Sequence, residues 1–492
     1  MKLLLILFVV GSASAALADP IVLGPAPAKA PFTLSKDTTA ITEPVNPDGT
    51  VDYVGAINQR AAAHLDPHDN GWALWVQLRG SQDIPTSTGA AMLRMAGADP
   101  LPATPLLRSY VEYLQQDKGL TANAAIAADD ERVAASKRLW KPADFPDLAD
   151  YLDSAKPALD LATRAARRPA WWIPAVSPDG SLMSVLLPGL ASQRDVANTL
   201  LARATLRAGA GDFHGFLEDL LTVKRLARHP NDNYIICELV SIAIDAAADR
   251  TLSAVAASGT LTAPQVQELS DALAALPAAD SVTRSVDLGE RWMLLDTIAE
   301  IATGKLASMP ADELFTDVYK SIVIQDVDWD LVLRQANAAI DDELALAAIP
   351  DYAKRKAAFA DFQKKWTAAE NPEDLPPILI LAKKHNEPRD AYSHRVANGI
   401  ISTLLPSLAR AFDIERQQTL TENLTRTLLA AAAFKARTGG WPEKLSDLVP
   451  RDLPGLPRDF NKNLPTYALT PAGPQISAAA DRALTLGAAP HP

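Results

Sequence analysis

NTLLARATLRAGAGDFHGFLEDLLTVKRLAR, residues 198–228, is the stretch that decides the fold. Its second half spaces apolar residues so that five side chains line one face of a helix: Phe213, Phe216, Leu217, Leu220 and Leu221. Gly211 and Asp212 separate this half from an equally helical first half. Because so short a break leaves neighbouring helices antiparallel, the stretch predicts a helix, a Gly-Asp turn and a second helix packed back on the first.

The same helical period dominates the chain on both sides of this hairpin. The hairpin resembles a tetratricopeptide-type unit, although only one such unit is evident, so a regular repeat and an irregular array of antiparallel helices both remain open. Residues 169–188, with several prolines, break the pattern and predict a loop or small hairpin. Further helices are predicted over residues 105–116, 121–140, 146–167, 234–252, 264–276, 281–303, 328–349, 352–369, 396–409 and 415–437. The expected fold class is mainly α, a solenoid-like or TPR-like array of antiparallel hairpins.

Composition excludes several classes of protein. The 492 residues hold 47 Lys and Arg against 59 Asp and Glu, a net charge of −12, and a single cysteine. One cysteine cannot form an intramolecular disulfide, so stability must come from buried apolar side chains. The negative charge argues against nucleic acid and anionic membrane surfaces as partners, because both are polyanions.

The N-terminus predicts export. Lys2 precedes a short apolar run and then small residues, which is typical of a signal peptide over residues 1–18, cleaved after Ala18 or alternatively after Ala15. The run is far shorter than the ~20 residues of a membrane span, so no transmembrane span is expected after cleavage. Residues 19–50 carry six prolines and predict an extended leader or linker that does not pack as a domain. The expected location is periplasmic or extracellular.

The chemistry of the chain changes after the last predicted helix. Gly439 and Gly440 can end that helix, and Trp441-Pro442 starts a short helical turn. Residues 466–470 and 475–478 flank a Pro-Ala-Gly-Pro turn and predict a β-hairpin. The predicted organisation is therefore a helical body over residues 51–414 and a helix-loop-β-hairpin module over residues 415–492.

The order of residues from 427 to 487 resembles the C-terminal part of the major pseudopilins of type II secretion. The resemblance rests on a long helix ending in Gly440-Trp441-Pro442, a Pro-Asp loop at Asp459, and Tyr467 leading into the hairpin. Similar tails end large uncharacterised secreted bacterial proteins with helical bodies, which the whole chain resembles. The chain lacks a prepilin-peptidase site followed by a long apolar helix, so the resemblance does not imply assembly into a pseudopilus. Phe460 stands where the family usually has proline, and calcium is not assigned to this loop.

Aromatic residues are the candidate binding residues. Trp171 and Trp172 form a pair in the proline-rich break, where they either offer a stacking platform for sugars or pack over a helix layer. Trp441 and Tyr467 belong to the C-terminal module, which either binds a partner or caps the end of the helical body.

Candidate catalytic residues lie in one polar segment. His385, Glu387 and His394 fall in the densest polar cluster of the second half, suited either to acid–base or metal chemistry or to a solvated helix connection. His64 and His68 have helical metal-ligand spacing, but Pro67 lies between them and disfavours the helix that this spacing needs.

Other polar residues have structural explanations. Asp326, Asp328 and Asp330 precede an apolar run and are expected to cap a helix, and Cys237 is expected to be a buried, inert thiol. The sequence contains no Gly-rich phosphate loop, no Gly-x-Ser-x-Gly elbow and no His-Glu-x-x-His motif. We therefore expect no cofactor and assign no metal.

The sequence favours a binding or scaffold protein outside the cytoplasm, presenting a helical surface to a protein partner in the cell envelope. The alternative is a secreted hydrolase of envelope glycan or peptide with a helical catalytic domain. Such an enzyme requires two carboxyl groups facing each other across a cleft, roughly 5 to 10 Å apart.

Overall fold

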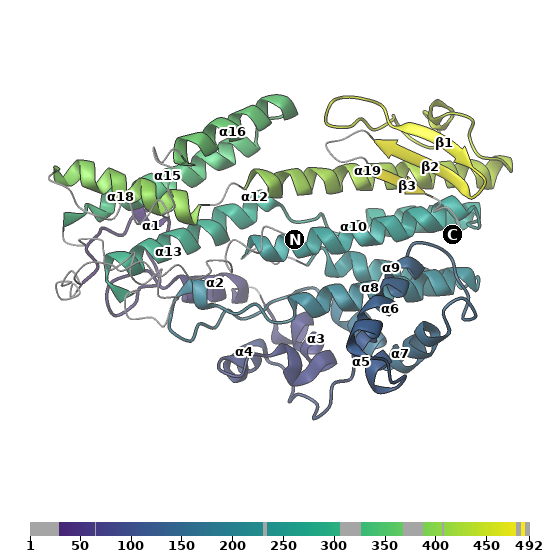
Figure 1. Cartoon of the computed structure of the whole chain (residues 1–492), viewed down its shortest axis with the longest axis horizontal. Helices are drawn as coiled ribbons and strands as arrows, with labels where there is room; N and C mark the ends of the chain where they lie inside the picture. Colours follow the sequence, from purple (N-terminus) through teal and green to yellow (C-terminus); the bar gives the residue numbers. More distant parts are fainter. Residues whose placement is uncertain are drawn as a thin grey trace.

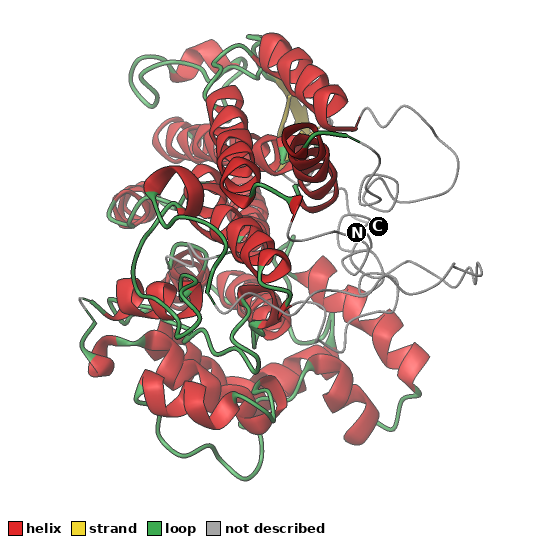
Figure 2. Cartoon of the chain, turned by 90° about the vertical axis from the view of Figure 1, so that its left-hand side faces the viewer, coloured by secondary structure: helices red, strands yellow, loops and turns green. Residues whose placement is uncertain are grey.

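A computed structural model describes residues 29–63, 65–229, 234–305, 326–367, 387–405, 408–478 and 484–487. Helices make up nearly all of the regular structure, and a small antiparallel sheet lies near the C-terminus (Figures 1 and 2). This confirms the predicted fold class, mainly α with a small C-terminal module. Among the described residues, no helix combines the length and apolarity needed to cross a membrane.

The described residues of the first part of the chain form six shorter helices and one long helix, α7. A 3₁₀ turn, Pro67–Asp69, precedes α3, and another, Gly80–Asp83, follows it. Asn70 caps α3 and also holds the distant residue 172, whose backbone N–H donates to Asn70 Oδ1 at 2.9 Å. The helices are α1 (Lys36–Thr39), α2 (Tyr53–Ala62), α3 (Gly71–Arg79), α4 (Gly89–Ala96), α5 (Tyr110–Gln116), α6 (Ala122–Ala135) and α7 (Pro146–Ala166).

The predicted hairpin is present as α8 (Leu190–Gly209) and α9 (Phe213–Leu226). Gly211 has φ +80°, a conformation that favours glycine, and the Asp212 carboxylate accepts the Gly215 backbone N–H at 2.9 Å to cap α9. The five apolar residues of the α9 stripe are all buried, which confirms the helical face predicted for them.

Longer helices complete the body. Helix α10 contacts α8 and α9 as well as the distant α19 (Figure 1). The helix predicted over residues 281–303 is interrupted by a π-helical turn, Val286–Glu290. A 3₁₀ turn, Leu182–Ser184, lies in the loop predicted over residues 169–188. The remaining helices are α10 (Ile235–Ser258), α11 (Ala263–Ala274), α12 (Val282–Ser285), α13 (Arg291–Ala302), α15 (Trp329–Ala347), α16 (Tyr352–Thr367), α18 (Arg389–Leu404) and α19 (Ala409–Thr438).

The C-terminal module packs onto this body. After the 3₁₀ turn Leu445–Leu448, strands β1 (Thr466–Thr470) and β2 (Gly473–Ala478) form the predicted hairpin, with Thr466 opposite Ser477. A third strand, β3 (Leu484–Gly487), pairs with β2 and was not predicted. The sheet rests on α10 and α19 (Figure 1).

Two hydrophobic clusters form the core, and α19 joins them. Phe412 of α19 belongs to the cluster built by α2, α13, α15 and α18. Leu424 and Leu428 belong to the cluster that includes α3, α7 to α11 and buried residues of the sheet. Residues 414 and 415, between which the C-terminal module was expected to begin, both lie within α19.

Residues 29–50 differ from the expected unpacked leader. They include α1, which packs against α15. Asp330 Oδ1 accepts the Thr33 backbone N–H at 2.7 Å, and Asn337 Nδ2 donates to the Lys36 carbonyl at 2.9 Å. The buried Tyr53 hydroxyl donates to the Thr39 carbonyl at 2.8 Å. We call residues 29–50 the strap. It has little apolar periodicity of its own, and side chains of distant helices form hydrogen bonds with its backbone N–H and C=O groups.

We expect Asp330→Ala to loosen the strap, because it removes the acceptor for two Thr33 hydrogen bonds. Trypsin cleavage after Lys36 should become faster and the free energy of unfolding should fall by about 1 kcal/mol. Asp328→Ala is the matched control, since Asp328 caps the same helix by accepting the Leu331 N–H. It should cost about 1 kcal/mol without loosening the strap, whose exposed Lys36 is held through its carbonyl by Asn337. Equal cleavage rates in the two variants would contradict the strap contact.

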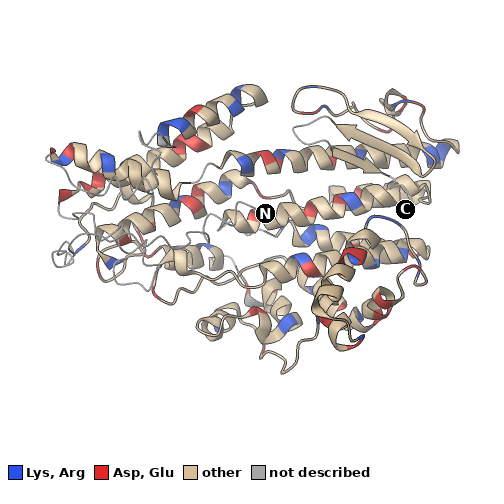
Figure 3. Cartoon of the chain, in the orientation of Figure 1, with Lys and Arg blue, Asp and Glu red and all other residues tan. Residues whose placement is uncertain are grey.

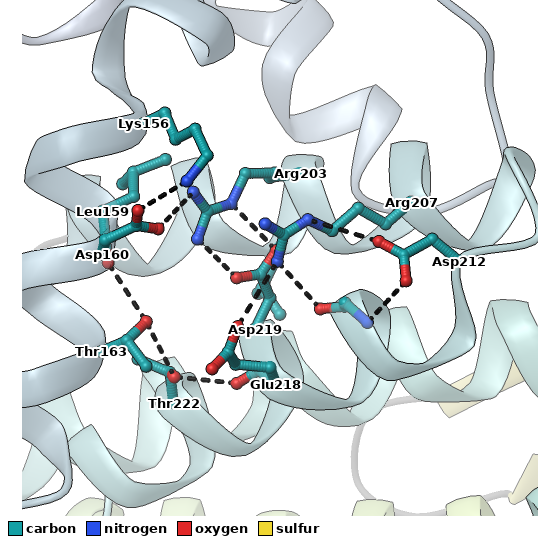
Figure 4. A network of polar contacts seen from close by, with 12 residues as sticks. Lys156, Leu159, Asp160, Thr163, Arg203, Arg207, Asp212, Glu218, Asp219 and Thr222 are labelled. Atoms are coloured by element: carbon teal, nitrogen blue, oxygen red, sulfur yellow. Dashed lines mark hydrogen bonds and ion pairs between the residues drawn. The ribbon is translucent and has the colours of Figure 1, made fainter.

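A buried network of charges ties α7, α8 and α9 together (Figure 4). Arg203 donates two hydrogen bonds to Asp219, at 3.0 and 2.7 Å, and Asp219 has no exposed surface. Arg207 also lies 3.0 Å from Asp219, and Arg203 reaches Asp160 at 3.6 Å. The network holds the hairpin to α7.

Candidate functional site

The predicted catalytic cluster does not converge in the structure. His385 lies outside the described residues. His394 is exposed on α18, where its Nδ1 lies 2.9 Å from Gln335 Oε1. Glu387 forms an ion pair with Arg395. These described residues fit the alternative of a solvated helix surface.

Trp171 and Trp172 do not form the sugar platform considered from the sequence. They are 7% and 9% exposed, whereas stacking on a sugar requires an open ring face. The Trp171 ring instead stacks on His229 with centroids 4.9 Å apart and meets Trp75 edge-on. The pair packs within the helix layers, as the other interpretation expected.

Trp441 and Tyr467 attach the tail to the body. Both rings are partly buried against the first hydrophobic cluster, and Lys435 Nζ lies 4.5 Å from the centre of the Trp441 ring. Burial raises the pKa of Tyr467 to about 12. Both residues therefore have a structural role in the contact between tail and helices.

The remaining sequence candidates have structural roles where they are described. His64 lies outside the described residues. Cys237 is 1% exposed, and burial raises the pKa of its thiol to about 12, which keeps it un-ionised. Asp459 accepts the backbone N–H groups of Asn461 and Asn463 at 2.9 and 2.8 Å, which orders its loop. No group of three or more His, Cys, Asp or Glu side chains in the described residues is placed to hold a metal ion.

A cleft between α11, α19 and the loop after η7 (Leu445–Leu448) is the best candidate for a binding site. It encloses ≈ 610 Å³, within the range of ligand sites in proteins, and we call it the α11/α19 cleft. Apolar side chains of α10, α11 and α19 form much of its wall, including Leu252, Val266, Leu273 and Leu429. Its charged lining comprises Lys224, Arg228, Arg426, Arg437 and Arg451 together with Asp249, Glu422 and Asp452.

A buried ion network closes the inner end of this cleft. Lys224, 1% exposed, places Nζ 2.6 Å from Asp249 Oδ1 and 3.0 Å from Asp245 Oδ1. The two acids are one turn apart on α10, so they share a face. From α19, Gln418 Nε2 donates to the second oxygen of each carboxylate at 2.7 Å. The network thus joins α9, α10 and α19.

Arg228 extends the network to the cleft rim. Its Nη2 lies 3.9 Å from Asp245 and 3.4 Å from Glu422, whereas its buried Nε has no hydrogen-bond partner among the described residues. Glu422 also pairs with Arg426 at 3.0 Å. We call these residues the Lys224 network: Lys224, Arg228, Asp245, Asp249, Gln418 and Glu422.

Burial raises the pKa of Asp249 to about 6, although the Lys224 ammonium opposes the rise. Burial alone would lower the pKa of Lys224, but Asp249 and Asp245 outweigh it and raise that pKa above its ordinary value. Lys224 therefore stays charged and holds the two acids in place.

The Lys224 network was not predicted from the sequence. Lys224 follows the apolar stripe of α9, where a lysine is easily read as solvent-facing. A signal was nevertheless present, because Asp245 and Asp249 have helical spacing in a segment expected to be covered on most sides. Their partner Gln418 lies 173 and 169 residues away, which local patterns do not show.

Comparisons with protein-family models, with curated proteins and with solved structures found no match for this chain. The resemblance of residues 427–487 to pseudopilins accordingly stays a prediction.

Proposed function

We propose that this chain is an extracytoplasmic binding protein that holds a segment of an envelope protein in the α11/α19 cleft. The observation that carries the proposal is the cleft itself, ≈ 610 Å³ between the helical body and the tail. The location outside the cytoplasm rests on the signal-peptide pattern of residues 1–18, which lie outside the described residues.

The lining of the cleft indicates the kind of segment it accepts. Apolar side chains of α11 and α19 favour apolar side chains in the occupant. Five basic side chains face three acidic ones, so the excess charge is positive in a chain whose net charge is −12. Arg451 is exposed and has no hydrogen-bond or ion-pair partner within the described part of the chain. A segment with apolar side chains and a carboxylate fits this lining.

Photo-crosslinking in cells tests this proposal. A crosslinking amino acid replaces Gln267, an exposed residue of the cleft rim, in the full chain, and captured proteins are identified by mass spectrometry. We expect one envelope protein to be captured, and we expect Ala433→Trp, which fills the cleft, to reduce capture about tenfold or more. Point variants are preferable to truncation, because Leu445, Leu448 and Ile476 of the tail belong to the main core.

The matched controls lie on α16. Ala357 is exposed, and no described residue of α16 lines the cleft. The crosslinker at Ala357 should therefore not capture the same protein, and Ala357→Trp should not reduce capture from Gln267. Capture from Gln267 that survives both Ala433→Trp and Arg451→Gln would overturn the proposal.

The hydrolase alternative receives less support from the cleft. Its lining acid Asp249 and the neighbouring Asp245 both hold Lys224 and Gln418, so neither is free to act as acid or nucleophile. Turnover of an envelope glycan or peptide by the purified chain, abolished by Asp249→Asn, would restore that alternative.

A further inference from the structure

A second hollow lies on the other side of α10, between α6, α8 and α10. It encloses ≈ 340 Å³. The hollow exists because the α10 residues that line it include small ones, such as Ala243 and Ala247. Helical spacing places these two alanines and Arg250 on one face of α10. Arg194 and Asn198 are one turn apart on α8 and face the same space. Val133, Ser136 and Lys137 at the end of α6 complete the wall, so the charged lining consists of Lys137, Arg194 and Arg250.

These three cations lack carboxylate partners. Within the described ranges, the side chains of Lys137, Arg194 and Arg250 form no hydrogen bond or ion pair, and no acid lines the hollow. Basic and acidic residues are interspersed elsewhere on the helices (Figure 3). Three cations without a partner in the described ranges therefore surround this one hollow.

The nearest acids in the sequence are already bound elsewhere. Asp195, next to Arg194, lies 2.7 Å from the buried Arg132. Asp249, next to Arg250, is held by Lys224 on the opposite side of α10. Because these carboxylates are occupied, they do not neutralise the cations of the hollow.

Buried hydrogen bonds fix the three walls relative to one another. Arg132 of α6 donates to the Asp195 carbonyl at 2.7 Å and to Thr199 Oγ1 at 2.8 Å, which ties α6 to α8. Thr251 Oγ1 donates to the Ser136 carbonyl at 2.8 Å, which ties α10 to α6. Both contacts fix the helices that carry the three exposed cations relative to one another.

We propose that this hollow binds a phosphate group carried by a small molecule or a lipid headgroup. Two arginines and a lysine suit a multiply charged oxyanion, since guanidinium groups match phosphate oxygens in pairs. The volume of ≈ 340 Å³ admits a headgroup or a small phosphorylated compound. The net charge of −12 repels extended polyanions, nucleic acid and densely anionic membrane surfaces alike, whereas a single phosphate group, free or on a headgroup, feels mainly the local cations.

Titration calorimetry of the full-length chain at low salt, with pyrophosphate as the soluble probe, tests the proposal. We expect saturable binding with one site per chain, weakened about tenfold or more by Arg194→Gln or Arg250→Gln. Ala243→Phe keeps every charge but fills the hollow, and it should also abolish binding. Arg94→Gln removes an exposed arginine of α4 and is the matched control that should leave binding unchanged.

Sedimentation with vesicles distinguishes the two sources of phosphate. Binding to phosphatidylglycerol-containing vesicles that is lost in Arg250→Gln, beside phosphatidylcholine vesicles as the reference, indicates a headgroup. Binding of pyrophosphate alone indicates a soluble ligand. The proposal fails if neither probe binds, or if Arg94→Gln weakens binding as much as Arg250→Gln does. The cations would then be only a solvated surface, on which Lys137 balances the C-terminal dipole of α6.

Discussion

Asp219→Asn should lower the free energy of unfolding by about 3–5 kcal/mol. The substitution keeps the size of the side chain but removes the charge that two arginines share. Arg203 is only 5% exposed, so its guanidinium would be left buried without its main counter-charge. Burial raises the pKa of Asp219 even though Arg203 and Arg207 oppose the rise, which shows how costly desolvation is at this position.

A double variant separates the destabilisation caused by leaving one charge unpaired from the net contribution of the ion pair to stability. Arg203→Met with Asp219→Leu replaces both charges with apolar groups, and it should recover most of the lost stability. Lys156→Gln is the matched control, because Lys156 and Asp160 belong to the same network (Figure 4) but are 63% and 39% exposed. It should cost less than about 1 kcal/mol.

Urea unfolding, followed by far-UV circular dichroism and by tryptophan fluorescence, measures these differences. The two signals must change together, since a chain with two hydrophobic clusters can unfold in steps. If Asp219→Asn costs no more than Lys156→Gln, the network does not have the burial described for it.

Local sequence patterns predicted the elements that fold through contacts between near neighbours. The α8/α9 hairpin follows from an apolar stripe, a glycine at positive φ and an aspartate cap within one short stretch. The β1/β2 hairpin follows in the same way from its turn residues. In both cases the residues that decide the structure lie within a few positions of one another.

Contacts between distant residues account for the failures. The strap at residues 29–50 lacks apolar periodicity, and its order comes from Asp330 and Asn337, about 300 positions away. For Trp171 and Trp172 the sequence left two interpretations open, and only their burial by distant helices decides between them. For the candidate sites, Lys224 and Arg250 look alike in the sequence, yet one is buried in an ion network and the other is exposed without a carboxylate. Their difference depends on which helices pack around α10.

The free energy of unfolding should fall as the pH rises from about 4 to 8, and Asp296 should be a main cause. Asp296 and Glu300 lie one turn apart on α13. Asp296 Oδ2 accepts the Leu182 backbone N–H at 2.7 Å, and Glu300 Oε2 accepts the Ser181 hydroxyl at 3.0 Å. Burial, with Glu300 adding to it, raises the pKa of Asp296 to about 8.

The sign of the pH effect follows from proton uptake. In the unfolded chain an aspartate titrates near ~3.9, so between about pH 4 and 8 the folded chain holds a proton that the unfolded chain releases. The stabilisation is complete below the unfolded pKa and is lost as the pH rises through the folded one. One such group changes the free energy of unfolding by up to about 1.4 kcal/mol per pH unit. Burial likewise raises the pKa values of Glu238 and Glu343 to about 7, so the whole chain should show the same trend.

Asp296→Asn should remove the Asp296 share of this dependence, because asparagine resembles the neutral acid and can still accept the Leu182 N–H. The free energy of unfolding of the variant minus that of the natural chain should be larger at pH 8 than at pH 5, as measured by urea unfolding at both values.

Asp179→Asn is the control, because the pKa of Asp179 is shifted in the opposite direction, downward. Burial would raise the pKa of Asp179, but hydrogen bonds from the Ser181 N–H and from the Ser184 and Ser177 hydroxyls lower it, so its stabilisation is lost only in more acidic solution. Asp179→Asn should therefore cost the same at pH 5 and pH 8. A contrary result would be a difference in free energy of unfolding between Asp296→Asn and the natural chain that is also the same at pH 5 and pH 8. Asp296 would then already be ionised in the folded protein, and the buried acid pair on α13 would not set the pH dependence of stability.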